Sequence, residues 1–179
     1  ISESIETTDT ILVMTRARLP WLLIAMLGGI AGAMVIGLYE EDLTKYQEMA
    51  FFIPLVVAMG GNVGIQSSAL IVQGLANNTL SKDGMPKRIL KELAVGLLNG
   101  IACTAVLMAY SFLFQYPLAL SFTIGASLLA VILFAAAFGT FMPLTLNKMN
   151  IDPALATGPF ITTSNDIIGL FFYFMIGRL

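Results

Sequence analysis

The sequence predicts an all-α membrane protein in which each subunit crosses the bilayer five times. Of its 179 residues, 58% are hydrophobic and only 11% are charged, whereas a soluble domain carries about a quarter charged residues. Residues 49–81 and 93–147 contain no charged side chain at all. Because a bilayer core of about 30 Å needs roughly 20 successive apolar residues in a helix, these runs indicate spanning segments.

The limits of the apolar stretches define the spans and make the whole chain, residues 1–179, a single membrane domain. We expect the spans at residues 19–39, 49–75, 93–114, 118–146 and 154–177. The long charge-free run holds two of them, separated at Gln115 and Pro117. The first span is not a signal peptide, because the preceding residues 1–17 are polar.

Lys and Arg are distributed unequally over the connections between the spans. Seven lie on one side, namely Arg16, Arg18, Lys82, Lys87, Arg88, Lys91 and Lys148. The opposite side holds only Lys45 and Arg178. Since the excess of basic residues marks the cytoplasmic side, we expect the N-terminus inside and the C-terminus outside.

The composition restricts the chemistry. With no His and one Cys, Cys103, the chain lacks the residues for a Cys/His zinc site, a serine triad or a Cys–His dyad, so we expect no enzyme and no cofactor. The net charge of −2 offers no basic surface for nucleic acid. Carboxylates, amides, hydroxyls and backbone groups remain.

Small residues recur at helical spacing in several spans. They are Gly28 with Gly32, Gly29 with Ala33 and Gly37, and Gly96 with Gly100. In lipid, such spacing lets helix backbones approach closely. We therefore predict helix contacts at all three sets.

The second span contains an unusual polar and glycine-rich stretch. Its members are Gly60, Gly61, Asn62, Gly64, Gln66, Ser67 and Ser68, preceded by Pro54. One interpretation is a weakened helix that exposes carbonyl oxygens to an ion pathway. The other is a packing pair, Gly60 and Gly64, with amides that hydrogen-bond to a neighbouring helix.

Asp166 is the most informative residue, because it lies at the expected midpoint of the last span. A carboxylate there costs a few kcal/mol even by the lowest scales, and every Lys and Arg falls in a connection or at an end. Asp166 is therefore either protonated or faces water and a mobile cation. Thr162, Thr163 and Asn165 make its surroundings polar and favour the second alternative.

Oxygen-rich surroundings without imidazole or thiolate indicate a hard divalent cation, Mg²⁺ before Ca²⁺. One carboxylate binds such an ion weakly, so we expect a homodimer that places two around one pore. Outside, Glu40 and Glu41 are expected to attract cations, or else simply to keep the loop solvated. The alternative function is a membrane anchor or assembly subunit without transport activity.

Several motifs together resemble the MgtE family of magnesium channels and transporters. They are residues 18–22 (RLPWL), Glu40 and Glu41, residues 51–56 (FFIPLV), Gly60, Gly61, Asn62, Gly64, Gln66 and Ser67, residues 152–154 (DPA), and Gly158, Pro159, Thr162, Thr163 and Asp166. The resemblance implies a homodimer in a bacterial or archaeal plasma membrane, with the ion path at the two-fold axis.

The resemblance also implies roles for individual residues. Asp166 matches the central carboxylate that holds hydrated magnesium, and Gly61 and Thr162 match positions whose carbonyls frame the ion. Asp152 matches an acidic position near the cytoplasmic mouth. The remaining pathway residues expected are Asn62, Gly64, Gln66, Thr163 and Asn165.

Two departures from the family pattern accompany the resemblance. Ile65 and Ala69 are apolar where members usually carry Asn and often Thr, so a homologue with altered cation selectivity is an alternative. The family's cytoplasmic regulatory part, an acidic helical domain with paired CBS domains, is not present in this chain.

Overall fold

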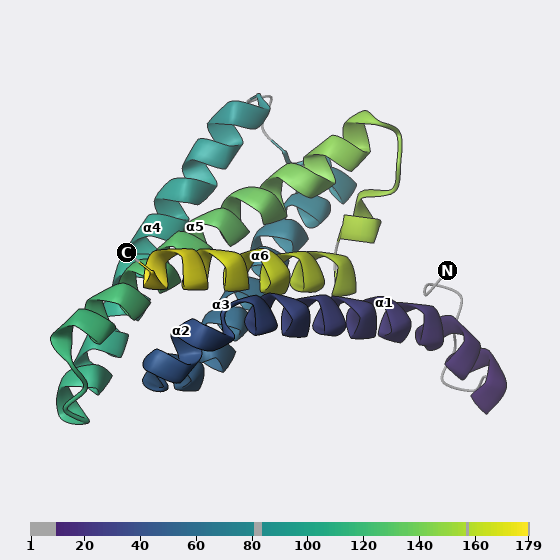
Figure 1. The fold of residues 1–179 in the computed structure, drawn as a ribbon. Helices are drawn as coiled ribbons and strands as arrows, with labels where there is room; N and C mark the ends of the chain where they lie inside the picture. Colours follow the sequence, from purple (N-terminus) through teal and green to yellow (C-terminus); the bar gives the residue numbers. More distant parts are fainter. Residues whose placement is uncertain (1–9, 81–83, 157, 179) are drawn as a thin grey trace.

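The fold is all-helical in a computed structural model that describes residues 10–80, 84–156 and 158–178 (Figure 1). The helices are α1 (Ile11–Leu38), α2 (Glu40–Lys45), α3 (Glu48–Ala76), α4 (Met85–Leu113), α5 (Leu118–Lys148), the 3-10 helix η2 (Pro153–Ala156) and α6 (Pro159–Gly177). Within the described residues, α1, α3, α4, α5 and α6 are the five helices long and apolar enough to cross a membrane. The prediction of five spans is confirmed.

Two helices begin well before the apolar stretch that predicted them. The helix expected from residue 19 begins at Ile11 and includes Arg16 and Arg18, and the helix expected from residue 93 begins at Met85. Arg and Lys are good helix formers, and their long side chains extend from a helix to the membrane surface. The apolar stretch therefore marks the hydrocarbon-spanning part of a helix and not its ends.

The last span is not the single helix expected at residues 154–177. Pro153–Ala156 form η2, and α6 begins only at Pro159, after Gly158 adopts a φ of 75°. Glycine tolerates this left-handed conformation, and proline suits the first turn of a helix. Asp166 consequently lies seven residues, about 10 Å, from the start of α6 and eleven residues from its end.

Helix α5 is the centre of the bundle. It packs against α3, α4 and α6, and Ile124, Val131 and Ile132 on it are fully buried. By contrast, α1 packs chiefly on α6, and Figure 1 shows the two helices side by side. Most of the α1 surface therefore remains available to lipid or to another protein.

The predicted glycine contacts are confirmed for two sets, whereas the third set makes no helix contact through its glycines within the described residues of this chain. A Cβ atom added at Gly28 would meet Thr163, and one at Gly32 would lie 3.3 Å from Leu170 of α6. Gly96 and Gly100 likewise face α5. Gly29 and Gly37 are exposed, with no described atom within 4 Å of an added Cβ, because only one stripe of α1 faces α6.

Helix α3 is continuous through its glycines, so the helix is not broken there. Gly60 packs against Val131, whose Cγ1 would lie 2.9 Å from an added Cβ, and Gly64 packs against Asn165. The expected amide contacts are not seen, because Asn62 and Gln66 are exposed on α3.

An ion pair and two aromatic contacts tie α2 to the end of α6. The Arg178 guanidinium donates to Asp42 at 2.7 Å, which raises the pKa of Arg178, and it lies 4.4 Å from the centre of the Tyr39 ring. Tyr39 in turn stacks on Phe174 with 4.6 Å between ring centres. The connection after α1 and the end of α6 therefore lie at the same end of the bundle, as expected from the odd number of spans.

Replacing Tyr173 with Phe is expected to lower the free energy of unfolding by about 1 kcal/mol. The fully buried Tyr173 hydroxyl donates to the Met49 carbonyl at 2.7 Å and joins the end of α6 to the start of α3. Thermal unfolding in detergent would measure the change. Tyr46→Phe is the control, because Tyr46 is exposed; equal melting temperatures for the two variants would contradict the prediction.

Candidate cation site

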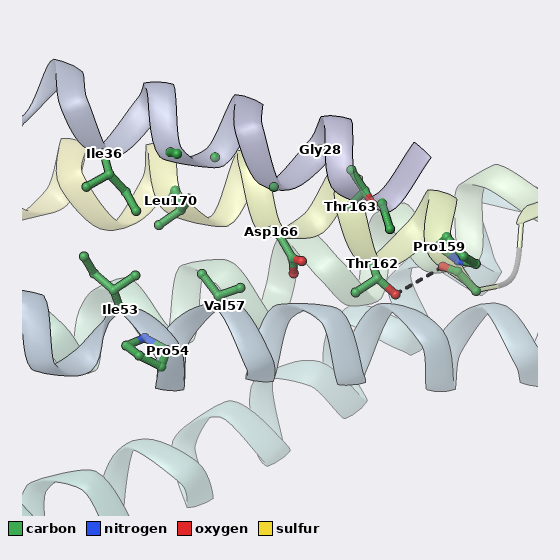
Figure 2. Close-up of a pocket in the computed structure, with 15 residues that line it drawn as sticks. Gly28, Ile36, Ile53, Pro54, Val57, Pro159, Thr162, Thr163, Asp166 and Leu170 are labelled. Carbon is green, nitrogen blue, oxygen red and sulfur yellow. Dashed lines mark hydrogen bonds between the residues drawn. The ribbon is translucent and has the colours of Figure 1, made fainter. Parts of the chain in front are cut away.

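A cavity of about 660 Å³ lies between α1, α3 and α6 (Figure 2). Helix α1 lines it with small residues and Ile36, α3 with Ile53, Pro54 and Val57, and α6 chiefly with polar residues. The lining residues of α6 are Pro159, Thr162, Thr163, Asp166 and Leu170. The cavity therefore has apolar walls and one polar side.

Asp166 is the only ionisable residue among the described residues that line the cavity. Figure 2 shows its side chain pointing from α6 toward α3, together with that of Thr162. The Oδ1 atom of Asp166 is buried and has no hydrogen-bond partner among the described residues. A buried carboxylate oxygen without a donor is costly, so the position favours a ligand that supplies positive charge or donors.

Gly61 has no side chain, so the Asp166 side chain can pack closely against α3 at this position. A Cβ atom at Gly61 would lie 3.4 Å from Asp166 Oδ1 and 3.2 Å from Thr162 Cγ2. The Thr162 hydroxyl donates to the Gly158 carbonyl at 3.1 Å and is thereby held at the start of α6. The three residues expected to hold the metal, Asp166, Gly61 and Thr162, thus lie together.

The expected pathway residues do not all lie at this cavity. Thr163 lines it and packs on Gly28. Gly64 and Asn165 pack against each other within the α3–α6 contact, and neither polar atom of the Asn165 side chain has a partner among the described residues. Asn62 and Gln66 are exposed on α3 and do not line the cavity.

The peripheral acidic residues lie outside the spanning helices. Glu40 and Glu41 are exposed in the first turn of α2. Asp152 is exposed just before η2, and its Oδ1 accepts the Ala154 N–H at 2.9 Å. Glu40 and Glu41 therefore lie just after α1, and Asp152 lies between α5 and η2.

The contribution of α1 to the cavity was not anticipated from the sequence. Gly29 and Ala33, expected to form helix contacts, line the cavity instead. The sequence signal was present, because two adjacent stripes of small residues run along α1 and a single partner helix can cover only one of them.

The described residues of a single chain group few side chains that bind metal ions. Within the part of the chain that the structure describes, no three His, Cys, Asp or Glu side chains are grouped so that they could hold a metal ion. Of the lining residues that the structure describes, Asp166 is the one with an ionisable side chain. Further ligands would have to be backbone or hydroxyl oxygens, waters, or groups from another chain.

Comparison with known proteins identifies relatives over most of the chain. A family model named MgtE, described as a divalent cation transporter, matches residues 53–176. The chain is 35% identical to the magnesium transporter MgtE of Bacillus subtilis over 89% of its own length. It is 34% identical to that of Thermus thermophilus over 91% and 33% identical to that of Enterococcus faecalis over 97%. It spans only 35%, 36% and 38%, respectively, of these relatives.

Proposed function

Since this chain belongs to the MgtE family of divalent cation transporters, we propose that it is the ion-conducting membrane domain of such a transporter, with Mg²⁺ as the favoured ion. The family also agrees with the prediction that the chain is not an enzyme, because its described activity is cation transport. The bacterial relatives support a plasma-membrane location.

The observation that carries the proposal is the unpartnered carboxylate oxygen of Asp166 at a cavity of about 660 Å³. Mg²⁺ loses its waters reluctantly and is usually held by one or two carboxylates with several waters retained. A cavity of this size leaves room for such a hydrated ion. No described residue donates a hydrogen bond to Asp166 Oδ1. The positive charge of the ion would offset the cost of burying this carboxylate.

Neighbouring groups complete the proposed site. The Gly61 and Thr162 backbones, next to Asp166, would present carbonyl oxygens to the ion's water shell, and Thr163 would add a hydroxyl from the cavity wall. A helix carbonyl keeps a second lone pair after its intrahelical bond, so it can accept a further hydrogen bond from water. The ion is then held through water and can leave again.

We propose that two copies of the chain form the pore about a two-fold axis. A single Asp166 is one charge for a divalent ion, and a second copy would supply another. Asn62 and Gln66 support this arrangement, because they are exposed on a spanning helix and polar amides are disfavoured toward lipid. The part of α3 from Asn62 to Gln66 would then face the partner, beyond the segment Phe51–Met59.

The orientation proposed is N-terminus inside. The basic connections at the α3–α4 and α5–η2 ends would lie in the cytoplasm, and Asp152 would lie near the cytoplasmic mouth. Glu40 and Glu41, exposed in α2, would raise the cation concentration at the outer mouth.

Flux measurements on liposomes containing the purified chain test the proposed function. We expect Mg²⁺ to enter down its gradient and millimolar Mg²⁺ to raise the melting temperature of the chain. A membrane anchor or assembly subunit would show neither effect. Repeating both measurements with Ca²⁺, Mn²⁺ and Na⁺, and with Ile65→Asn, identifies the selectivity: flux of Na⁺ equal to that of Mg²⁺ would contradict a divalent cation transporter.

A further inference from the structure

A second cavity, the α3–α4 groove, lies on the opposite side of α3 from the cavity that Asp166 lines. It measures about 520 Å³. Its walls include Phe51, Leu55 and Met59 of α3 and Ala102 and Val106 of α4, and Leu128 of α5 also lines it. Both α3 and α4 pack on α5, so the groove follows the gap between them.

The groove is bounded at both ends by contacts between α3 and α4. At the end where α3 begins, Phe52 packs edge-on against Tyr110 of α4 and Tyr116, with 6.3 and 5.4 Å between ring centres. Further along α3, the Ser67 hydroxyl donates to the Glu92 carboxylate of α4 at 3.1 Å. From Phe51 to Met59 the groove follows eight residues of helix, about 12 Å.

The groove opens to the membrane. Phe51 is 68% exposed and Val106 is 71% exposed, and both belong to spanning helices. The side of the groove is therefore continuous with the surface that α3 and α4 present to hydrocarbon. An empty apolar groove would forfeit dispersion contacts. Among the described residues that line it, only Tyr110 and Cys103 carry a group that could hydrogen-bond to water, so a hydrocarbon chain is the ligand that fits.

The charges at one end indicate which headgroup belongs to that chain. Glu48 is exposed one turn before Phe51 and Phe52, and so lies above the groove on the same helix. The pKa of Tyr116 is raised by burial, by the Tyr110 hydroxyl and by the Glu48 carboxylate, so Tyr116 stays neutral near Glu48. Lys45, the basic residue nearest in sequence, lies over the Tyr46 ring at 5.0 Å.

We propose that the α3–α4 groove binds an acyl chain of a phospholipid whose headgroup carries an ammonium group, as phosphatidylethanolamine does, with that ammonium against Glu48. An anionic headgroup such as phosphatidylglycerol would place negative charge beside the Glu48 carboxylate and bind more weakly. This lipid site does not depend on the proposed cation site, because Asp166 lines the other cavity.

Native mass spectrometry of the delipidated full chain tests the site. With phosphatidylethanolamine we expect a retained lipid adduct that forms about tenfold more readily than with phosphatidylglycerol, the effect of one charge-assisted hydrogen bond. Ala102→Leu fills the groove and is expected to remove the adduct. Ala105→Leu is the matched control, because Ala105 is exposed on α4 and does not line the groove.

The headgroup preference of a Glu48 variant and cross-linking at Cys103 test the lipid site further. Glu48→Gln, at an exposed position, is expected to abolish the preference between the two lipids even if Ala102→Leu folds poorly. Equal adducts for Ala102→Leu and Ala105→Leu, or no headgroup preference in the unaltered chain, would overturn the proposal. Cys103, the only cysteine, lines the groove, so a covalent dimer formed by a bismaleimide would show a second copy there instead of lipid.

Discussion

Asp166→Ala is expected to abolish divalent cation flux through reconstituted liposomes, with a loss on the order of a hundredfold or more. The variant removes the single ionisable group that the described part of the chain places at the α1–α3–α6 cavity. Without the carboxylate, the ion would meet apolar walls and neutral oxygens. These cannot offset the free-energy cost of transferring the ion out of bulk water. Flux of Mg²⁺ with a fluorescent indicator inside the liposomes would measure the loss.

Asp166→Asn separates charge from shape. It keeps the side-chain volume next to Gly61, so the fold is expected to persist while Mg²⁺ flux is lost. In cation-free buffer its melting temperature is expected to equal or exceed that of the unaltered chain, because a buried, unpartnered carboxylate oxygen disappears. The melting shift caused by Mg²⁺ should vanish as well. Unchanged flux in either variant would refute the assignment of the ion site to Asp166.

The spans could be predicted because the bilayer imposes a minimum apolar length that the sequence must meet. The helix ends could not be predicted in the same way. Arg16 and Arg18 continue α1 beyond the hydrocarbon-spanning part, and nothing in hydropathy distinguishes a helical extension from a loop. The break before α6 did have a signal, the Gly158–Pro159 pair, because the residue before a proline is disfavoured in the helical conformation.

Asp166 could be identified because a lone carboxylate in an apolar segment is costly enough to require a reason. Its position in the cavity depended on tertiary contacts that no local pattern specifies. The spacing of small residues on α1 indicated close packing, but it could not distinguish Gly28, which packs on Thr163 of α6, from Gly29, where an added Cβ would meet no described atom within 4 Å. That distinction depends on which stripe of α1 its partner covers.

The amides of the second span show the same limit. The sequence placed Asn62, Gln66 and Asn165 in one polar pathway, whereas in the structure Asn165 is buried in the α3–α6 contact and the other two are exposed on α3. Adjacent helical residues point about 100° apart, so Asn165 and Asp166 need not share surroundings. The pathway proposed for Asn62 and Gln66 depends on a second copy of the chain, which a single sequence does not contain.

Gly139→Ala is expected to destabilise the protein more than any other glycine-to-alanine change in the bundle. An added Cβ on α5 would meet the Gly64 carbonyl oxygen and would lie 3.1 Å from both the carbonyl carbon and the Cα of Gly64. These are backbone atoms of α3, so no side-chain rotation can relieve the overlap, and the two helices must separate. Overpacking of this kind costs about 1–3 kcal/mol, and occasionally more.

The same change is expected to lower Mg²⁺ flux, because α3 also carries Gly61, against which Asp166 and Thr162 lie. Moving α3 away from α5 would alter the spacing between Gly61 and Asp166 and hence the frame around the ion. Gly37→Ala is the matched control, since an added Cβ there meets no described atom within 4 Å and Gly37 does not line the cavity. Thermal unfolding and flux should both decrease for Gly139→Ala and stay within error for Gly37→Ala. Equal behaviour of the two variants would mean that α3 and α5 are not in backbone contact at Gly64, and the position of Gly61 beside Asp166 would then lose its structural basis.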